Sequence, residues 1–578
     1  MKPKHLKALL FLFLVEGILS MALFIQKPSK PDRAVLFNFS LSRLGLVFVV
    51  FVALVGASYF LVRLYSKGSF PDRMANSIHA YLTASDDRIH LASLFLAAAS
   101  LFSFEVFLIG YISLPIHIRP LLLWLVLTLL QVWLVLRFVY QASFRLKPTL
   151  WTRLRTGFTS LTRTQRQVII AIFVLSSLYF IAFIPANFGG AETMHNFFLS
   201  GGDEYVIYPS VIKLMTPGAK ISSSIHHLLI DVSWWYGYPY LPISAATLIL
   251  PRIIYGLSFG DQVQINLLLL RQFISVLPML ISIALMVYLV TRFKSRLLSI
   301  GMFIFLVLIP GVVKFNYRFW HPDSLILLLT LLTVHFLVKD NLRFKWNFHL
   351  AAVTCALSAV LKLWGFFFFL VIAGYLLAGL IKKILTVKRT FLAGTTFIVV
   401  MAGTMLISTP AYLYPPAVDA LINDWGNQLS TNAVGYDEPD PDGVYQTGME
   451  NWLKYFDKSF MRPWFFFFSF TALLLGSLWG SQTYLNRILL GWCLVTAIYL
   501  IYFVSVKSFQ YMIPLMLPLY MAGFLLPALA EVKTGAVWSS KLPQPFMKLF
   551  LWGITILLYS IQFIINITKI LDLPFINV

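Results

Sequence analysis

Apolar runs of about twenty residues recur along the whole chain, and they limit its possible folds more than any other feature. A helix of that length crosses the roughly 30 Å of hydrocarbon in a bilayer. Lipid offers the backbone no hydrogen-bond partners, so runs of this kind must form helices. The composition agrees, because 59% of the 578 residues are hydrophobic and 12% are charged. We therefore predict an all-α polytopic membrane protein.

The runs predict about fifteen transmembrane helices. The two at 348–362 and 364–381 are short, so this stretch is either one broken helix or a re-entrant hairpin. Met1 to Lys7 and the apolar run behind it lack a small-residue cleavage site, so we expect a retained first span. The predicted spans are 7–26, 44–65, 91–112, 119–140, 168–187, 264–291, 297–314, 323–338, 348–362, 364–381, 391–408, 464–480, 488–505, 512–529 and 548–566.

The net charge of +22 is concentrated in short loops between the runs, which is typical of the positive-inside rule rather than of nucleic-acid binding. The loop from Arg145 to Arg166 carries six basic residues and no acid, so we place it in the cytoplasm. Alternation then puts the basic loops 291–296, 339–345 and 382–389 on the same side. The basic stretch Lys27–Arg43 falls on the other side and disagrees with this register.

The same register places two long loops outside, at about 188–263 and 409–463. Long connections in compact proteins are usually functional, and we expect these to contain interfacial helices. The chain thus divides into an accessory region of about four spans, 1–167, and a main bundle, 168–578. Cysteine usage indicates no disulfide framework, because the two cysteines lie in apolar runs.

Two adjacent carboxylates, Asp203 and Glu204, follow a span early in the first outer loop. Adjacent acids repel each other, and they persist where they bind a cation or where one works as a base. A solvated turn is the alternative, since Gly-Gly-Asp is ordinary turn chemistry. Further along come His226 and the aromatic segment 234–240, which includes Tyr238. That segment suits the membrane interface, or stacking on a sugar ring.

Other polar residues stand at the outer ends of later spans. They are Arg318, His321, Asp323, Lys362, Lys507 and Tyr511. For the lysines and the arginine the alternative is snorkelling toward the interface. The acidic stretch 437–443 resembles a calcium loop, but the required glutamate is replaced by Met449, which favours a stiff Pro-rich loop. The register collects all these polar residues on one outer face.

Over roughly 168–530 the chain resembles the GT-C glycosyltransferases, a polytopic class that includes protein O-mannosyltransferases and lipid A aminoarabinose transferases. One motif departs from the family pattern, because Gln510 stands where such proteins usually have arginine, with Lys507 nearby. The motifs that carry the resemblance are Asp203-Glu204, Tyr236–Leu241, Arg318–Asp323, Ala359–Lys362 and Phe509–Pro514.

The resemblance implies a sugar donor linked to polyprenyl phosphate in the bilayer, and an acceptor hydroxyl on a protein, lipid or glycan. It implies that Asp203 is the general base and that Glu204 orients a substrate. Arg318, Lys362 and Lys507 would stabilise the phosphate. The sugar pocket would include His321 and Asp323, and the remaining substrate-binding residues would be Tyr511, His226 and Tyr238.

The same resemblance implies no metal or other cofactor and no nucleic-acid partner. It places the protein in the plasma (inner) membrane with its active site on the non-cytoplasmic side. The alternative is a polytopic transporter or lipid flippase. Such a protein would carry ionisable residues near mid-span and inverted repeats, and the sequence has few of the former and no obvious repeat.

Overall fold

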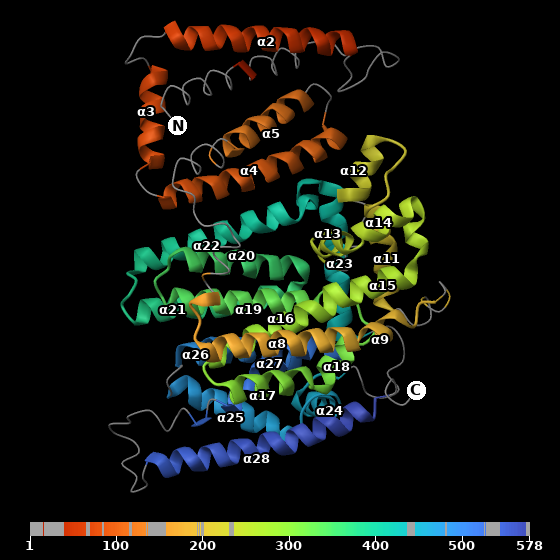
Figure 1. The fold of residues 1–578 in the computed structure, drawn as a ribbon, viewed down its shortest axis with the longest axis vertical. Coiled ribbons are helices and arrows are strands. Elements are labelled where there is room, and N and C mark those ends of the chain that lie inside the picture. The colour runs from red at the N-terminus through yellow and green to blue at the C-terminus, as the bar shows by residue number, and fades with distance from the viewer. Residues whose placement is uncertain are drawn as a thin grey trace. The chain divides into compact units, whose positions relative to one another are not determined.

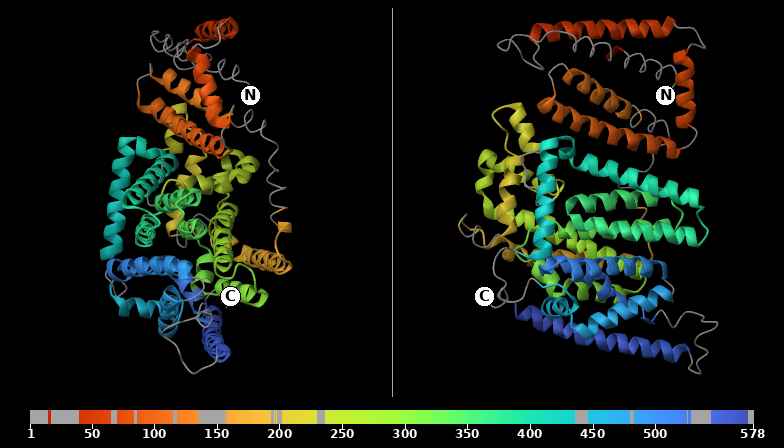
Figure 2. Two further views of the ribbon diagram at one scale, coloured as in Figure 1. Left: turned by 90° about the vertical axis from the view of Figure 1, so that its left-hand side faces the viewer. Right: turned by 180° about the vertical axis from the view of Figure 1, so that it is seen from behind.

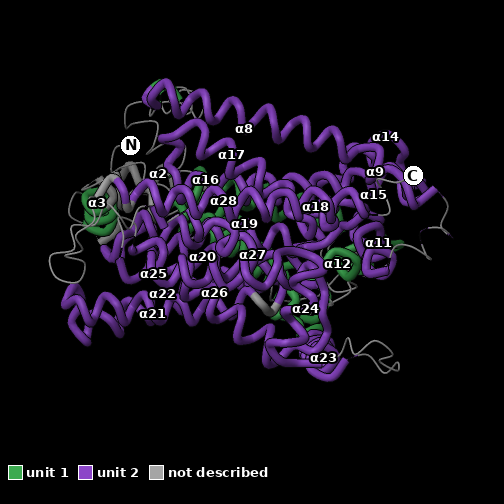
Figure 3. Tube along the Cα trace, turned by 90° about the horizontal axis from the view of Figure 1, so that it is seen from below, with its two compact units in different colours: residues 1–159, 217–230, 410–418 green, residues 160–216, 231–409, 419–578 purple. Residues whose placement is uncertain are grey.

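The computed structural model describes the chain as helices joined by turns (Figure 1). The described residues are 15–16, 40–64, 70–83, 86–114, 118–134, 136, 156, 158–192, 195, 197, 202–229, 236–435, 446–479, 483–524, 526–527 and 544–573. The acidic stretch 437–443 lies outside them, as does almost all of the first predicted span. The chain forms two compact units: a smaller one of residues 1–159, 217–230 and 410–418, and a main unit of residues 160–216, 231–409 and 419–578 (Figure 3).

The smaller unit is built on a pair of packed helices, α4 (Asp86–Ser113) and α5 (Arg119–Leu134). Helix α12 (Ile221–Leu229) and the 3-10 turn Pro410–Leu413 pack on α4. The unit also contains α2 (Leu41–Leu64) and α3 (Phe70–Thr83). Residues 217–230 and 410–418 of this unit lie in the two predicted outer loops. Each of those loops therefore contributes a helical segment to the smaller unit.

The main unit stacks its helices in layers (Figure 2). Helix α19 packs against α16 and α20, while α25, α26 and α27 pack on one another. Helix α23 runs across the others in every view (Figures 1 and 2). The helices are α8 (Arg163–Ala182), α9 (Ile184–Phe188), α11 (Asp203–Leu214), α13 (Tyr240–Thr247), α14 (Ile249–Tyr255), α15 (Val263–Leu270), α16 (Leu277–Thr291), α17 (Arg296–Val307), α18 (Pro310–Asn316), α19 (Asp323–Asp340), α20 (Trp346–Leu361), α21 (Phe368–Ile381), α22 (Val387–Ser408), α23 (Pro415–Val434), α24 (Met449–Ser459), α25 (Pro463–Leu478), α26 (Thr483–Phe503), α27 (Phe509–Ala522) and α28 (Gln544–Leu571).

Six helices of the described residues are long and apolar enough to cross a membrane, or up to nine if each of three bent pairs counts as one span. The class predicted from the sequence, an all-helical membrane protein, is therefore confirmed, while the count of about fifteen stays a prediction. The predicted span 297–314 is bent by 62° between α17 and α18. Proline removes a backbone donor and kinks helices, and Pro310 begins α18. The end of the first predicted loop contains another apolar pair, α13 and α14 with the turn Gly256–Asp261, bent by 49°.

The uncertain stretch 348–381 forms two helices, α20 and α21, joined by a 3-10 turn over Leu363–Phe367. Lys362 ends α20 with an extended backbone, at φ −164° and ψ 144°. The break therefore leaves the Lys362 side chain at the end of a buried helix rather than along its wall. Both cysteines are buried and free, Cys355 on α20 and Cys493 on α26.

Candidate functional site

Three charged or titratable side chains meet where α19 begins and α20 ends. His321 lies just before α19, and its Nδ1 is 2.7 Å from Oδ2 of Asp323, the first residue of that helix. An acid in the first turn is favoured by the helix dipole. The Lys362 Nζ lies 3.4 Å from both Asp323 oxygens. The His321 and Asp323 side chains are buried and that of Lys362 is 9% exposed, so the Asp323 carboxylate is partnered on both sides by groups that stabilise its charge.

The turn that precedes α13 extends this group toward the surface. The Tyr236 Oη lies 2.7 Å from Nε2 of His321 and donates a hydrogen bond of 2.9 Å to Oδ2 of Asp203. Asp203 begins α11 and is 54% exposed, whereas His321 is 1% exposed. Asp203, Tyr236, His321, Asp323 and Lys362 thus form a continuous series of contacts, which we call the polar chain. It joins an accessible carboxylate to a buried ion pair.

A close backbone approach holds the Tyr236 turn in place. The Gly237 N–H donates to the Leu361 carbonyl at 3.0 Å, at the end of α20. A Cβ on Gly237 would lie 1.3 Å from the Val360 carbonyl oxygen, so only glycine fits there. This contact positions Tyr236 beside the residue that follows Leu361, which is Lys362. The polar chain is therefore assembled by backbone packing between two segments far apart in the sequence.

We expect Gly237→Ala to displace Tyr236 and reduce the activity of the site at least about tenfold. Overpacking of this kind typically costs about 1–3 kcal/mol of stability. The measurement is the thermal unfolding midpoint of the purified protein, together with its activity. Gly374→Ala is the matched control, because nothing lies within 4 Å of its added Cβ. A wild-type midpoint and activity for Gly237→Ala would contradict this account of the turn.

Glu204, the second carboxylate of the acidic pair, forms a buried ion pair with Arg271. Arg271 Nε donates to its Oε1 at 3.0 Å and Arg271 Nη2 to its Oε2 at 2.5 Å, and both side chains are 2% exposed. Glu204 Oε1 also accepts the Trp320 backbone N–H at 2.5 Å. The remaining Arg271 donors bind the carbonyls of Asn187 and Gly189. Glu204 therefore has the geometry of a positioning residue, and Asp203 is the carboxylate that faces solvent.

Arg271 begins a π-helical segment, Arg271–Val276, between α15 and α16 within one candidate span. Such segments inside α-helices are frequent at functional sites. Ser275 of this segment accepts the His321 backbone N–H at 3.1 Å. Tyr240 stacks on Trp320 with ring centroids 5.4 Å apart and meets Tyr236 edge-on. The Glu204–Arg271 ion pair and the polar chain are therefore linked through the backbone of 320–321 and through the packed rings of Tyr240 and Trp320.

Burial sets the protonation of the two groups in the middle of the polar chain. Burial, and then the Asp203 carboxylate, raises the pKa of Tyr236 well above its usual range, so its hydroxyl keeps its proton. Burial lowers the pKa of His321, against the opposing effect of Asp323. A neutral imidazole has one nitrogen free to accept a proton. Among the described residues, no group of three or more His, Cys, Asp and Glu side chains is arranged to hold a metal ion.

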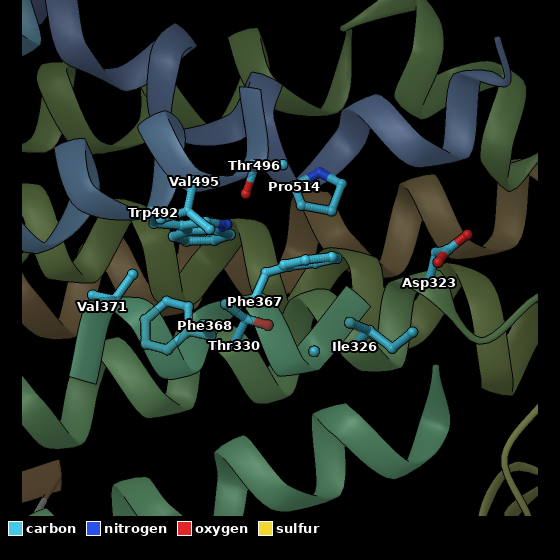
Figure 4. A pocket seen from close by; sticks show the side chains of 11 residues that line it. Asp323, Ile326, Thr330, Phe367, Phe368, Val371, Trp492, Val495, Thr496 and Pro514 are labelled. Atoms are coloured by element: carbon cyan, nitrogen blue, oxygen red, sulfur yellow. The ribbon is translucent and has the colours of Figure 1, made fainter. Parts of the chain in front are cut away.

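Each member of the Lys362–Asp323 pair lines a pocket. The first is mostly apolar, with Asp323 at one end (Figure 4). Its other lining residues include Ile326, Phe367, Trp492, Val495 and Pro514. The second is lined by Lys362, Gln428, Asn432, Tyr499 and Tyr511, with three aliphatic residues. The buried ion pair thus separates an apolar pocket from a more polar one.

Lys362 contacts aromatic rings as well as Asp323. Its Nζ lies 4.7 Å from the centre of the Tyr511 ring and 5.6 Å from that of Tyr236. Aromatic faces stabilise an ammonium group at such distances. The Tyr511 hydroxyl donates to Asn432 Oδ1 at 3.2 Å, which connects α27 to α23. Five of the site residues expected from the sequence, Asp203, His321, Asp323, Lys362 and Tyr511, therefore lie together.

Four other expected site residues have the following surroundings. Arg318 is exposed, its Nε donates to the Ala186 carbonyl at 3.0 Å, and its guanidinium packs on Gly189. Lys507 Nζ donates to the Gln446 carbonyl at 2.6 Å. Tyr238 is buried. His226 belongs to the smaller unit, where its ring contacts Tyr414.

Sequence reasoning missed three residues of this site: Tyr236, Arg271 and Asn432. Arg271 had a usable signal, because it is a lone cation inside a predicted span, where charges are rare and usually functional. Tyr236 stood in a motif that was recognised, but nothing distinguished it from neighbouring aromatic residues. Asn432 had no signal, since polar residues are common in a loop. No family model matches the chain, and no curated protein or solved structure is significantly similar to it.

Proposed function

We propose that this protein is a membrane glycosyltransferase that moves a sugar from a polyprenyl-phosphate donor to an acceptor hydroxyl. One observation carries the proposal: an apolar pocket lined by Asp323 and a polar pocket lined by Lys362 flank one ion pair, which the polar chain joins to an accessible carboxylate. A lipid-linked sugar has three parts of matching chemistry, namely an isoprenoid chain, a phosphate and a hydroxylated ring. The acceptor then needs a base, and Asp203 is the exposed end of the polar chain.

The apolar pocket suits the first isoprene units of the donor. Its walls come from α19, α21, α26 and α27, and aromatic and aliphatic side chains predominate (Figure 4). Burying a methylene group there is worth about 0.8 kcal/mol. The phosphate would lie at the end of the pocket near Lys362. A compact ammonium group is a common phosphate ligand.

The polar pocket suits the sugar. Gln428 and Asn432 offer amide groups, and Tyr499 and Tyr511 offer rings and hydroxyls. Side-chain amides donate and accept hydrogen bonds, as sugar hydroxyls do. Asp203 would take the proton of the acceptor hydroxyl as it attacks the anomeric carbon. The departing phosphate gains negative charge, which Lys362 would stabilise. Arg318 and Lys507 would serve the phosphate only after leaving their present carbonyl partners.

The proposal includes the finer topology expected from the sequence. About fifteen spans and two outer loops, about 188–263 and 409–463, would place the site on the non-cytoplasmic side of the plasma membrane. Cysteine labelling from outside tests this sidedness. A single cysteine at Glu450, which is 83% exposed, should react with an impermeant reagent in intact cells. Protection of that cysteine would contradict the register.

The main test is transfer itself. The purified protein in lipid nanodiscs should carry a co-purifying polyprenyl phosphate, detected by mass spectrometry of the extracted lipid. It should also move radiolabelled sugar from a polyprenyl-phosphate donor to a hydroxyl acceptor. A transporter or lipid flippase would instead move the lipid or a solute across vesicles with every bond intact. Lipid movement without bond cleavage would overturn the proposal and favour that alternative.

Blocking the apolar pocket should weaken donor binding. We expect Val495→Trp, which places a large ring on the pocket wall, to raise the KM for a long-chain donor roughly tenfold. The estimate assumes about two displaced methylene contacts at about 0.8 kcal/mol each. Ile498→Trp is the matched control, because Ile498 is exposed on the same helix. An unchanged KM for Val495→Trp would show that the chain binds elsewhere.

A further inference from the structure

The Tyr236 hydroxyl lies between two proton acceptors. Its oxygen is 2.9 Å from Oδ2 of Asp203 and 2.7 Å from Nε2 of His321. A phenol carries one proton and accepts through its oxygen. At any moment the hydroxyl can therefore donate to only one of the two neighbours. The neighbour that receives no proton from Tyr236 must either donate to its oxygen or find another partner.

Two arrangements satisfy every group in this part of the polar chain. In the first, a protonated Asp203 donates to Tyr236, and Tyr236 donates to Nε2 of a neutral His321. In the second, a protonated Nε2 donates to Tyr236, and Tyr236 donates to the Asp203 carboxylate. Nδ1, which lies 2.7 Å from Oδ2 of Asp323, carries a proton in both. The arrangements differ only in the shift of one proton across each of two hydrogen bonds.

We propose that Tyr236 and His321 form a proton relay that takes from Asp203 the proton of the acceptor hydroxyl and stores it on His321. This rests on the proposed function and extends it. The acceptor O–H bond breaks as its oxygen bonds the anomeric carbon. The bond from that carbon to the phosphate oxygen breaks, and its electron pair goes to the phosphate. Tyr236 gives one proton and takes another, so it is never ionised.

The destination of the proton has an electrostatic consequence. An imidazolium at His321 lies beside Asp323 and near Lys362, where the departing phosphate gains negative charge. The relay thus moves positive charge from the acceptor side of the site to the leaving-group side. Asp203 returns to its ionised form within the same step and stays a carboxylate. We assign Tyr236 and His321 as positioning residues that act through Asp203.

Titratable and charged groups face His321 from four parts of the fold. Asp203 faces it from α11, Tyr236 from the turn before α13, Asp323 from α19 and Lys362 from the end of α20. Burial lowers the pKa of His321 and keeps the resting ring neutral, and the nearby Lys362 charge acts in the same direction. The Asp323 and Asp203 carboxylates oppose this effect and stabilise the charged ring, so His321 can hold a proton for the short time that a relay requires. The Ser275 hydroxyl accepts the His321 backbone N–H and fixes the position of the residue.

The first test is the pH dependence of turnover in Tyr236→Phe, which keeps the ring against Lys362. Wild-type turnover should fall as pH decreases through the pKa of His321, since a protonated His321 cannot receive a proton. In Tyr236→Phe, Asp203 is cut off from His321, so this dependence of turnover on the protonation of His321 should disappear. Maximal kcat should drop about 10- to 100-fold with the donor KM unchanged. Tyr255→Phe, on α14, is the matched control. An unshifted profile would overturn the relay.

The second test needs no substrate. Asn at position 203 mimics the protonated acid, because its amide can donate to Tyr236 and direct the Tyr236 proton to His321. At pH 8, ¹⁵N-histidine NMR should show that Asp203→Asn moves the His321 Nε2 shift toward a hydrogen-bonded value. In the Tyr236→Phe background the same substitution should leave that shift unchanged. His321→Asn identifies the resonance.

The two tests separate the relay from the proposed function. An equal NMR response with and without the Tyr236 hydroxyl would show coupling through space alone and overturn the relay. A coupled NMR response in a protein that transfers no sugar would support the hydrogen-bonded chain while overturning glycosyl transfer. In a transferring enzyme, Tyr236→Phe/His321→Asn should lose no more activity than His321→Asn, because both residues serve one path. Additive losses would contradict a shared path.

Discussion

Asp203→Asn is expected to lower sugar transfer about 10²- to 10⁴-fold, the usual contribution of a general base. The amide has nearly the same shape as the carboxylate but cannot take a proton. Asp203 is half-exposed at the start of α11, so the substitution should leave the fold and membrane insertion unchanged. The measurement is kcat with a lipid-linked donor, alongside the elution profile and unfolding midpoint of the protein.

The donor KM separates the role of Asp203 from a general effect on binding. We expect it to stay within about twofold of wild type, because the pockets lie beside Lys362 and Asp323 and do not include Asp203 among their lining residues. Glu450→Gln is the matched control, since Glu450 is an exposed acid that pairs with Lys454 on the surface of α24. Full activity in Asp203→Asn would exclude Asp203 as the base and leave the proposed mechanism without one.

Arg271→Met is expected to destabilise the protein by about 3–5 kcal/mol, because it leaves Glu204 buried and without a countercharge. The two side chains are each 2% exposed and joined by two hydrogen bonds. The measurement is the free energy of unfolding in detergent. Glu204→Gln/Arg271→Met should recover most of the loss, since replacing both members of a buried pair is often nearly neutral.

An exposed pair provides the comparison. Glu450 and Lys454 lie one turn apart on α24, 3.0 Å from each other and 83% and 70% exposed. Surface pairs of this kind contribute little, so Lys454→Met should leave the unfolding free energy unchanged. If Arg271→Met left the free energy of unfolding unchanged, as expected for Lys454→Met, the Glu204–Arg271 pair would not be needed for stability. A double variant no more stable than Arg271→Met alone would show that Arg271 acts through other partners.

The hydropathy of a segment depends only on its own residues, so it predicted those features of the fold that depend on the solvation of each segment. The all-helical membrane class and the apolar helices followed from runs that lipid forces into helices. The size of the bends did not: Pro310 marks a place where the span can break, but the 62° angle at Leu308–Ile309 depends on what the two halves pack against. The apolar pair α13–α14 was assigned to a loop, since prolines and aromatic residues interrupt its run.

The candidate site shows the same division. The acidic pair was visible in the sequence, but the two carboxylates could not be told apart there. Tertiary packing separates them, because Glu204 is enclosed by Arg271 and the Trp320 backbone, while Asp203 faces solvent and Tyr236. Lys362 and Asp323 were each expected at the outer end of a span, but of different spans. Their contact depends on α19 packing against α20.

The sequence by itself determined that this chain is a helical membrane protein with polar residues at the ends of its apolar runs, because both follow from the solvation of each residue. Only the tertiary structure decided which of those residues meet. Asp203, Tyr236, His321, Asp323 and Lys362 span about 160 positions, and their contacts depend on helix packing and on one glycine turn at the end of α20. Distances between side chains so far apart in the chain depend on the whole fold, which no local pattern encodes.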